Sequence, residues 1–341
     1  MNVSIITYSL LSFVLFFFCG KISYKLNLVD LPNKRKIHFK PTAYTGGISL
    51  SIILLLGIQL FDFSDKNLNL IFSIGFLISV VGLIDDKYNL NIGSKLSLQI
   101  IPILYLIVFE NLFLNELGNY DYFALGLGSF SLPFSLLSVL FLINAFNYFD
   151  GLDGVLGFTS ITVITILYFL VPDEDIKLFL IIISIPICIF LCFNFSIFRL
   201  PKLFLGDNGS LLLGFIFAFI LIYLSNQKLI HPILLAWSIA IFVYEFLSIN
   251  LIRIKNKKDP FTAGQDHLHH LLFEKTNSIF LTNFFMCFTN IILFFIGFLS
   301  FRFSSSVVSL FLFILFFIIF FIIRNSYFKK SKLFKRAYFR N

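Results

Sequence analysis

The chain has 341 residues, of which 58% are hydrophobic and 13% are charged, and its mean hydropathy is +0.94. These values exclude a soluble globular domain and predict an all-α integral membrane protein, because spanning segments must satisfy their own backbone hydrogen bonds in lipid. The four cysteines stand inside apolar runs and form no C-x-x-C pair. Neither a disulfide framework nor a thiolate zinc site is therefore predicted.

Eleven apolar stretches of the sequence are candidate spans, which predicts a bundle of about 10–11 transmembrane helices. They cover residues 3–20, 46–61, 70–84, 96–113, 130–147, 154–171, 176–193, 210–225, 232–252, 280–300 and 305–323. Lysines follow the first stretch, at Lys21 and Lys25, rather than preceding it. We therefore interpret it as a retained span and not as a secretory signal.

The basic residues divide unequally between the two sides of the membrane that these spans define. Of the 26 Lys and Arg residues, 22 fall on one side. The other four are Lys66, Lys177, Lys228 and Arg302. The positive-inside rule thus predicts a multi-pass inner-membrane protein with its amino terminus outside, a membrane domain over residues 1–323 and a basic cytoplasmic tail over residues 324–341. The net charge of +8 suits contact with anionic lipids, and no nucleic-acid motif accompanies it.

Two adjacent aspartates, Asp85 and Asp86, end the predicted span 70–84 in the stretch GLIDDKYNLNIGSK. Like charges side by side repel unless a cation or a proton lies between them, so the pair indicates metal binding, phosphate handling or proton transfer. Lys87 and Lys95 follow closely. A polar helix end followed by a turn explains this stretch equally well when it is taken alone.

The stretch NAFNYFDGLDG places Asn144, Asn147, Asp150 and Asp153 three residues apart. If the helix continued through them, they would lie along one stripe, and the two glycines would let the backbone turn or approach a ligand. Carboxylate and amide oxygens suit Mg²⁺ and also bind a nucleoside by hydrogen bonds. Capping of a helix end does not require four such residues, so a functional site is favoured.

The stretch FLGDNGS sets Asp207 and Asn208 between two glycines, directly before the predicted span 210–225. The amides at such a helix start bind anions readily. A simple helix N-cap at Asp207 or Ser210 is the alternative interpretation.

Three histidines, His267, His269 and His270, lie together in a basic loop. If this segment is helical, His267 and His270 share a face, and imidazoles among Lys and Arg suit phosphate oxygens. Zinc is the less favoured interpretation, since no cysteine accompanies the cluster and no H-x₃-H pair exists.

Five stretches resemble, in order, the motifs of the polyprenyl-phosphate N-acetylhexosamine-1-phosphate transferases, a family of glycosyltransferase family 4. They are PNKRKIHFKPTAYTGG, GLIDDKYNL, NAFNYFDGLDG, FLGDNGS and DHLHH. The resemblance runs from about Pro32 to His270, and HLHH looks more like the GlcNAc-type polysaccharide initiators than the muramoyl-pentapeptide branch. The chain departs from the usual pattern at three positions. Ala43 stands in PTAYTGG where the motif often reads P-T-P, Glu245 stands where the family usually has Asp, and Gly264 stands where an acidic residue is common.

The resemblance implies a magnesium-dependent phosphotransferase whose active site lies at the cytoplasmic face. It would transfer an N-acetylhexosamine 1-phosphate, by default GlcNAc-1-phosphate, from a UDP-sugar to undecaprenyl or another polyprenyl phosphate and release UMP. Such a reaction initiates lipid-linked cell-envelope polysaccharides such as O-antigen or teichoic acid. The expected partners are the lipid carrier, the UDP-N-acetylhexosamine and the membrane, with a homodimer as a candidate assembly.

The resemblance also assigns roles to residues of this chain. Asn147 and Asp207 would bind Mg²⁺, for which Mn²⁺ is a substitute. Asp85 and Asp86 would orient or deprotonate the lipid phosphate, and His267 is also assigned to catalysis. The substrate-binding set is Lys95, Asn144, Asp150, Asp153, Phe204, His269 and His270. Within this set, Phe204 would stack on uracil.

Three alternatives stay open. The nearest is the muramoyl-pentapeptide phosphotransferase of peptidoglycan synthesis. An aspartate-rich prenyltransferase would also use paired aspartates with Mg²⁺, but it expects D-D-x-x-D, and DDKYN lacks the last aspartate. A membrane transporter would place its polar groups near the bilayer midplane and show repeat symmetry.

Overall fold

The computed structural model describes residues 2–32, 40–259, 264 and 266–331. It confirms the prediction of an all-α membrane protein. The helices are α1 (Asn2–Lys25), α2 (Gly46–Phe61), α3 (Lys66–Tyr88), α4 (Ile92–Leu104), α5 (Ser131–Asn147), α6 (Val155–Leu170), α7 (Glu174–Asn194), α8 (Asp207–Asn226), α9 (Pro232–Ser238), α10 (Ala240–Lys255), α11 (Leu268–Thr276), α12 (Ile279–Phe303) and α13 (Ser306–Lys330). Two short antiparallel hairpins join β1 (Val29–Asp30) to β2 (Thr42–Ala43) and β3 (Glu116–Tyr120) to β4 (Phe123–Gly126).

The apolar stretches of the sequence correspond to helices of the bundle. Within the described ranges, eight helices are long and apolar enough to cross a membrane, α4 being extended by a π-helical turn at Tyr105–Phe109. The bent pair α9 and α10 gives a ninth candidate, and α2 and α6 are shorter apolar helices. Several helices exceed the bounds predicted from sequence. The last one runs to Lys330, past residue 323, where the tail was expected to begin.

The stretch 232–252, predicted as one span, is divided into α9 and α10, which meet at an angle of 73°. Such a break frees backbone groups that lipid cannot satisfy. Asn290 of α12 satisfies two of them. Its Nδ2 donates to the Ser238 carbonyl at 2.9 Å, and its Oδ1 accepts from the Ile241 N–H at 3.3 Å. One buried asparagine therefore stabilises the bend.

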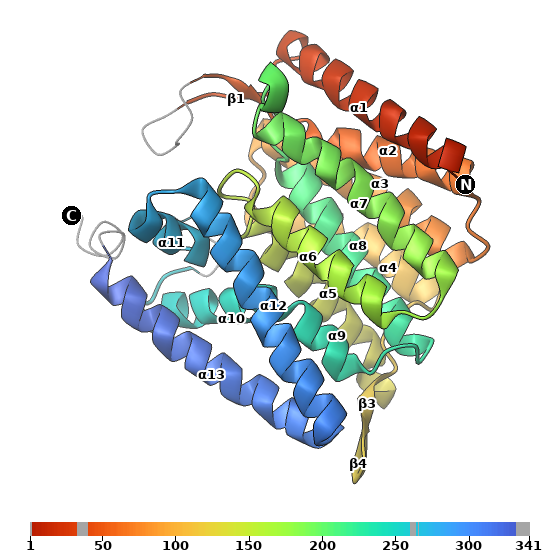
Figure 1. The fold of residues 1–341 in the computed structure, drawn as a ribbon, viewed down its shortest axis with the longest axis vertical. Coiled ribbons are helices and arrows are strands. Elements are labelled where there is room, and N and C mark those ends of the chain that lie inside the picture. Colours follow the sequence, from red (N-terminus) through yellow and green to blue (C-terminus); the bar gives the residue numbers. More distant parts are fainter. Residues whose placement is uncertain (1, 33–39, 260–263, 265, 332–341) are drawn as a thin grey trace.

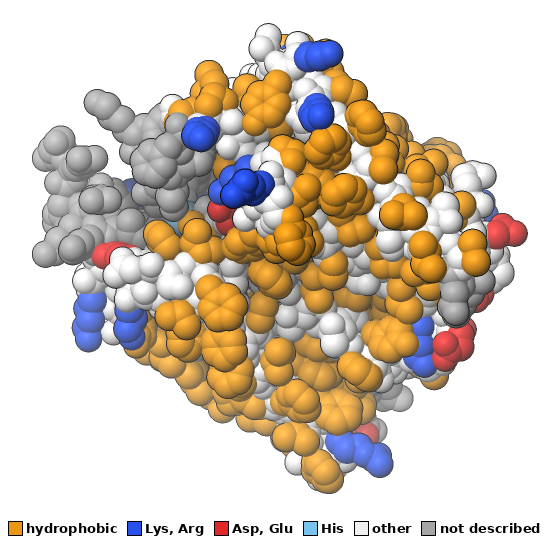
Figure 2. Space-filling view, turned by 45° about the horizontal axis from the view of Figure 1, so that its top comes forward, with side chains coloured by type: hydrophobic (Ala, Val, Ile, Leu, Met, Phe, Trp, Pro, Cys, Tyr) orange, Lys and Arg blue, Asp and Glu red, His pale blue; other side chains and the backbone are white. Residues whose placement is uncertain are grey.

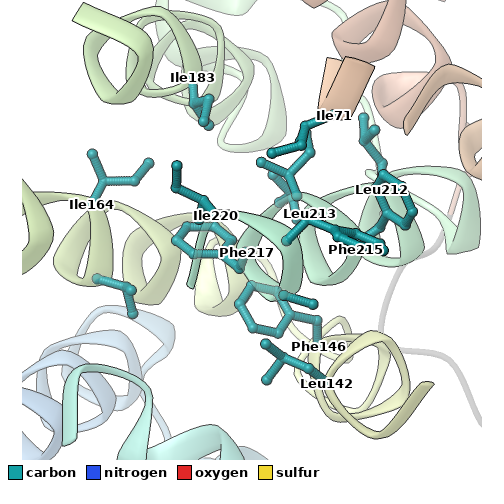
Figure 3. Packing of buried hydrophobic residues seen from close by; sticks show 14 of the residues in the cluster. Ile71, Leu142, Phe146, Ile164, Ile183, Leu212, Leu213, Phe215, Phe217 and Ile220 are labelled. Carbon is teal, nitrogen blue, oxygen red and sulfur yellow. The ribbon is translucent and has the colours of Figure 1, made fainter. Parts of the chain in front are cut away.

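Helix α8 lies at the centre of the bundle, with 94% of its most apolar window buried. Figure 3 shows its side chains surrounded by residues of α3, α5, α6 and α7, and the ring centroids of Phe146 and Phe217 are 5.0 Å apart. The helices approach most closely where α8 begins. A Cβ atom on Gly82 of α3 would lie only 2.4 Å from the Asn208 Cα, so glycine is required there. This contact fixes the start of α8 against the end of α3.

The two ends of the bundle differ in chemistry. In Figure 1, β1 and α11 lie at one end, and the β3–β4 hairpin lies at the other. The first end also holds the contacts that join the last turn of α3, the first turn of α4, the last residue of α5 and the start of α8. We call it the polar end. Hydrophobic side chains cover most of the surface between the two ends in the view of Figure 2, as expected for a belt that faces lipid.

Candidate active site at the polar end

Four of the predicted site residues meet at the polar end. The Lys95 ammonium, at the start of α4, lies 2.7 Å from Asp85 Oδ2 and also contacts Asp207 Oδ2. Asn147, the last residue of α5, donates from Nδ2 to Asp207 Oδ1 at 2.9 Å and to the Ser210 hydroxyl at 2.9 Å. We call Asp85, Lys95, Asn147 and Asp207 the central cluster. Segments more than a hundred residues apart in sequence thus bring two carboxylates, an ammonium group and an amide together.

The two adjacent aspartates have different partners. Asp86 accepts from the backbone amides of Asp207 and Asn208 at 3.0 and 3.2 Å, and from Asn208 Nδ2 at 2.6 Å. Asp85 instead accepts from the Leu90 backbone amide at 2.8 Å and turns its second oxygen toward Lys95. The anion expected at the start of α8 is therefore Asp86 itself, and Gly206, at φ +75°, is the N-cap of this helix.

Asn208 joins three helices, a role that could not be predicted from the stretch FLGDNGS. Besides its bond to Asp86, its Nδ2 donates to the Tyr44 carbonyl at 2.7 Å, and its Oδ1 accepts from the Ile48 amide at 2.6 Å. Its side chain is fully buried. Because these bonds connect the beginning of α2 and the end of α3 to the start of α8, they fix the direction in which Asp207 points.

The asparagines of α5 border a pocket beside the central cluster. The pocket is lined by Ile92, Lys95, Leu96, Asn144, Asn147 and Tyr148. Asn144 Nδ2 is bound to the Leu140 carbonyl at 2.7 Å, which holds the side chain along its own helix. Asp207, whose side chain is 31% exposed, stays accessible beside the buried end of Asp85. The arrangement leaves a polar opening between α4 and α5.

The helical stripe considered for the four polar residues of NAFNYFDGLDG does not extend through all of them. Helix α5 ends at Asn147, and Asp150 and Asp153 lie in the turns that precede α6. Burial raises the pKa of Asp150 well above its usual value, and the neighbouring charges of Asp207 and Asp86 add to the effect.

Lys202 connects two residues predicted to border a nucleotide. Its ammonium lies 2.6 Å from Asp153 Oδ2 and 5.3 Å from the centroid of the Phe204 ring. The backbone of Phe204 is fixed by β2, since its amide donates to the Ala43 carbonyl at 2.8 Å. Lys202 therefore lies beside both Asp153 and Phe204, and the sequence analysis did not include it. The nucleotide roles of Asp153 and Phe204 stay predictions.

The three histidines form a compact, buried group at the start of α11. The ring centroids of His269 and His270 are 4.2 Å apart, and His267 lies 4.7 Å from the ring of Tyr148. A Cβ atom on Gly151 would meet His269 Nε2 at 2.3 Å, so this group packs directly against the turns after α5. Burial lowers the pKa of His267 to about 3 and that of His270 to about 4. Burial thus favours the neutral form of these imidazoles over the cation.

The predicted absence of a zinc site stays a prediction. In the part of the chain that the structure describes, three or more His, Cys, Asp or Glu side chains do not gather in a geometry that could hold a metal ion. The two groups assigned to Mg²⁺, Asn147 and Asp207, are nevertheless within hydrogen-bond distance of each other.

The sequence of this chain matches a known protein family and known proteins. A family model described as Glycosyl transferase family 4 matches residues 68–225. A protein of Pasteurella multocida (strain Pm70), named undecaprenyl-phosphate alpha-N-acetylglucosaminyl 1-phosphate transferase, is 34% identical over 283 residues, which cover 80% of this chain and 78% of that protein. The chain belongs to glycosyl transferase family 4.

Proteins of the same name from other bacteria are similar over the same share of the chain. The protein of Escherichia coli O157:H7 is 28% identical over 284 residues, 80% of this chain and 77% of that protein. The protein of Yersinia pestis is 27% identical over 279 residues, 80% of this chain and 76% of that protein. The match to the family 4 model contains the whole central cluster, whereas the histidines and α13 lie beyond it.

Proposed function

We propose that this family 4 member transfers N-acetylglucosamine 1-phosphate from UDP-N-acetylglucosamine to undecaprenyl phosphate, releases UMP and thereby initiates a lipid-linked polysaccharide. The central cluster carries the proposal, because two carboxylates, an ammonium group and an amide lie where a membrane lipid and a water-soluble nucleotide would meet. The names of the three relatives described above support the GlcNAc sugar and the undecaprenyl carrier. They favour this reaction over the muramoyl-pentapeptide reaction.

The proposed reaction needs little catalysis by a general base. The second pKa of a phosphate monoester is near ~6, so the lipid phosphate is mostly dianionic at neutral pH. One of its oxygens attacks the β-phosphorus of the UDP-sugar, and the bond from that phosphorus to the bridging oxygen breaks, which releases UMP. The main barrier is repulsion between two anions. Lys95, placed between Asp85 and Asp207, is the residue we assign to neutralising it.

A divalent cation fits the same cluster. Asp207 offers a carboxylate, and Asn147 would offer its amide oxygen, also a hard donor, once the amide turns over, because its Nδ2 is the atom that faces Asp207. The Lys95 ammonium already shows that a cation is stabilised beside Asp207. We propose that these two residues hold Mg²⁺, or Mn²⁺ in its place, with water and diphosphate oxygens as further ligands. When bound, the metal would supply charge neutralisation for the diphosphate.

The remaining site residues divide between the two substrates. Asp153, Lys202 and Phe204 form the group that we assign to the nucleotide, with the Phe204 ring stacking on uracil. Asp85 is assigned to orienting the lipid phosphate. Asp86 is assigned to holding the start of α8, a change from the catalytic role that the sequence suggested.

The histidines act, in this proposal, as neutral hydrogen-bonding groups for sugar or phosphate oxygens. Nδ1 of His267 and Nε2 of His269 have no hydrogen-bond partner among the described residues, so both can bind a substrate oxygen. His270 lies beside them, close to Gly151. Burial favours the neutral form of all three imidazoles, and this form still has one N–H that can donate to an oxygen.

We further propose that the polar end faces the cytoplasm of a bacterial cell and that the amino terminus lies outside. The distribution of Lys and Arg supports this orientation, because basic residues gather on the cytoplasmic side of membrane proteins. The proposed substrate supports it as well, because UDP-sugars are found in the cytoplasm. A homodimer stays a prediction, which the mass of the detergent-solubilised particle would test.

The test is a reconstitution of purified protein with undecaprenyl phosphate and a panel of UDP-sugars, with UMP release as the readout. UDP-GlcNAc should be used at least about tenfold better than UDP-GalNAc or UDP-MurNAc-pentapeptide. Release should require both the lipid phosphate and a divalent cation, so a chelator should abolish it and Mg²⁺ should restore it. Absence of lipid-dependent UMP release with every sugar would refute the proposed function.

Asp207→Asn tests the assignment of the metal ligand. We expect a loss of turnover of at least about a hundredfold, because the amide removes the charge that both Lys95 and the metal require. Asp207→Glu should regain part of the activity with Mn²⁺. The matched control is Asp62→Asn, an exposed aspartate outside the polar end whose left-handed backbone, at φ 44°, suits asparagine. Equal turnover of Asp207→Asn and the control would remove Asp207 from the site.

A further inference from the structure

A buried arginine on α13 stands out from the rest of that helix. Only 11% of the most apolar window of α13 is buried, so most of the helix faces outward, where lipid is expected. Arg324 belongs to the buried minority of the helix, with Ser306, Ser309 and Phe328, and it is the charged one among these four, with a residue exposure of 2%. The sequence placed it in a solvated basic tail. A charged side chain withdrawn from water on an otherwise exposed helix needs a specific partner.

The partner is a carboxylate on α10. Glu245 is 1% exposed and receives two bonds from Arg324, from Nη2 to Oε1 at 3.1 Å and from Nε to Oε2 at 3.2 Å. This fork geometry matches a guanidinium to a carboxylate through two parallel bonds. The pair therefore joins α13 to α10 at the polar end.

The same pair holds the backbone that leads into the histidines. Arg324 Nη2 also donates to the Asp266 carbonyl oxygen, and Glu245 Oε1 accepts from the Leu268 backbone amide at 2.8 Å. The Asp266 carboxylate is bound separately by Arg253 of α10, at 2.7 and 3.1 Å. The backbone on both sides of His267 is thus held by hydrogen bonds, at the Asp266 carbonyl and at the Leu268 amide.

These bonds do more than neutralise charge. A buried ion pair stabilises a fold only weakly when compared with apolar packing, but it strongly selects one arrangement of the groups that it contacts. Here the selected groups are a carbonyl and an amide that flank His267, and His269 and His270 follow directly in α11. The arrangement fixes where the imidazoles lie relative to the turns after α5.

We infer that α13 serves the active site: Arg324, together with Glu245, is a positioning residue that holds the backbone of residues 266–268 and so sets the three histidines beside the loop at Gly151. The inference rests on the proposed function, because the histidines are assigned there to substrate. It adds to that function a residue outside the region that matches the family 4 model.

The experiment compares four variants with the wild-type protein in detergent. They are Arg324→Met, Arg324→Lys, the double variant Glu245→Met with Arg324→Met, and Arg302→Met as the control. Arg302 is an exposed arginine at the far end of α12, so its loss should change nothing at the polar end. The double variant removes both charges at once and leaves no unpaired ion, so it keeps the test valid if the single variant fails to fold.

Two readouts are needed. Amide hydrogen exchange of the peptide covering residues 266–276 should become at least about tenfold faster in Arg324→Met and in the double variant, while peptides of α8 keep their protection. UMP release should show a fall in kcat of at least about tenfold with a smaller change in the KM for the UDP-sugar. Arg324→Lys should recover part of both, since one ammonium can still bind a carbonyl or a carboxylate.

Three outcomes would overturn the inference. The first is unchanged exchange and turnover in Arg324→Met. The second is a double variant with wild-type kcat, because Arg324 would then only compensate the charge of Glu245. The third is faster exchange throughout α8 as well, which would mean a general structural role. If the wild-type protein released no UMP, the proposed function would fail, while the exchange readout would still decide whether Arg324 holds the histidine segment.

Discussion

Asp85→Asn and Asp86→Asn should have different defects: the first should lower turnover, and the second should lower stability. Asp86 only accepts hydrogen bonds, and all three of its donors come from Asp207 and Asn208 at the start of α8. Asparagine at this position offers one acceptor and brings new N–H groups that face N–H groups. Asp85→Asn keeps an oxygen for the Leu90 amide and loses only its charge toward Lys95.

The structure sets the size of the difference. Hydrogen bonds to a charged group contribute about 1.5–3 kcal/mol each, and an unpaired buried donor costs about 1–3 kcal/mol. Asp86→Asn loses at least one such bond and leaves at least one donor unpaired, so we expect a destabilisation of about 2.5–6 kcal/mol. With a shift of ~2–3 °C per kcal/mol, the unfolding midpoint should fall by roughly 5–18 °C. Asp85→Asn keeps the Leu90 bond and leaves Lys95 paired with Asp207, so its effect on stability should be much smaller than that of Asp86→Asn.

Thermal unfolding in detergent and UMP release together separate the two roles. Asp86→Asn should lower the unfolding midpoint, whereas Asp85→Asn should keep the midpoint and lose at least about tenfold in turnover. A wild-type midpoint for Asp86→Asn would show that its three bonds do not hold the start of α8. Full turnover of a stable Asp85→Asn would remove Asp85 from the reaction.

Three further predictions address the nucleotide group, pH and orientation. Lys202→Met should raise the KM for the UDP-sugar by about tenfold with little change in kcat, while Lys228→Met, an exposed lysine, should not; equal KM values would contradict the assignment. Burial lowers the pKa of His267 to about 3, so the unfolded state takes up a proton first as the pH falls below ~6.5, and stability should fall from pH 7 to pH 5. His267→Gln should weaken this pH dependence of the unfolding midpoint, and an unchanged slope would argue against a buried neutral imidazole. In a background without the native cysteines, an impermeant maleimide applied to intact cells should label Tyr122→Cys and not Asn256→Cys, and the reverse pattern would invert the proposed orientation.

The parts of the fold that depend on local pattern could be predicted from sequence. Apolar stretches gave the helices, because lipid requires every spanning segment to satisfy its own backbone. The family resemblance assigned Asn147 and Asp207 to one metal ion, and in the structure Asn147 Nδ2 lies 2.9 Å from Asp207 Oδ1. The bend between α9 and α10 could not be predicted in this way, since it depends on Asn290, which lies about fifty residues further along the chain.

The roles within the site were harder to predict than its position. Consecutive residues of a helix point about 100° apart, which explains why Asp85 and Asp86 have different partners. The two aspartates were predicted to act as one pair, whereas the helix turns their side chains toward different partners. Lys202 gave no local signal, because its contact with Asp153 spans 49 residues and depends on the turns that connect α5 to α6 and α7 to α8.

Glu245 and Arg324 show which long-range contact a membrane sequence can reveal. A carboxylate in the middle of an apolar stretch is costly unless it is neutralised, so Glu245 by itself requires a basic partner on a neighbouring helix. Arg324 follows the last apolar stretch directly, and the charge count assigned it to the solvated tail because hydropathy cannot tell a buried arginine from an exposed one. Packing decides which basic residue becomes the partner of Glu245. Arg324 can reach it because α13 lies against α10 and extends to Lys330. The burial of this pair therefore places Arg324 in the packed part of α13 and not in a solvated tail.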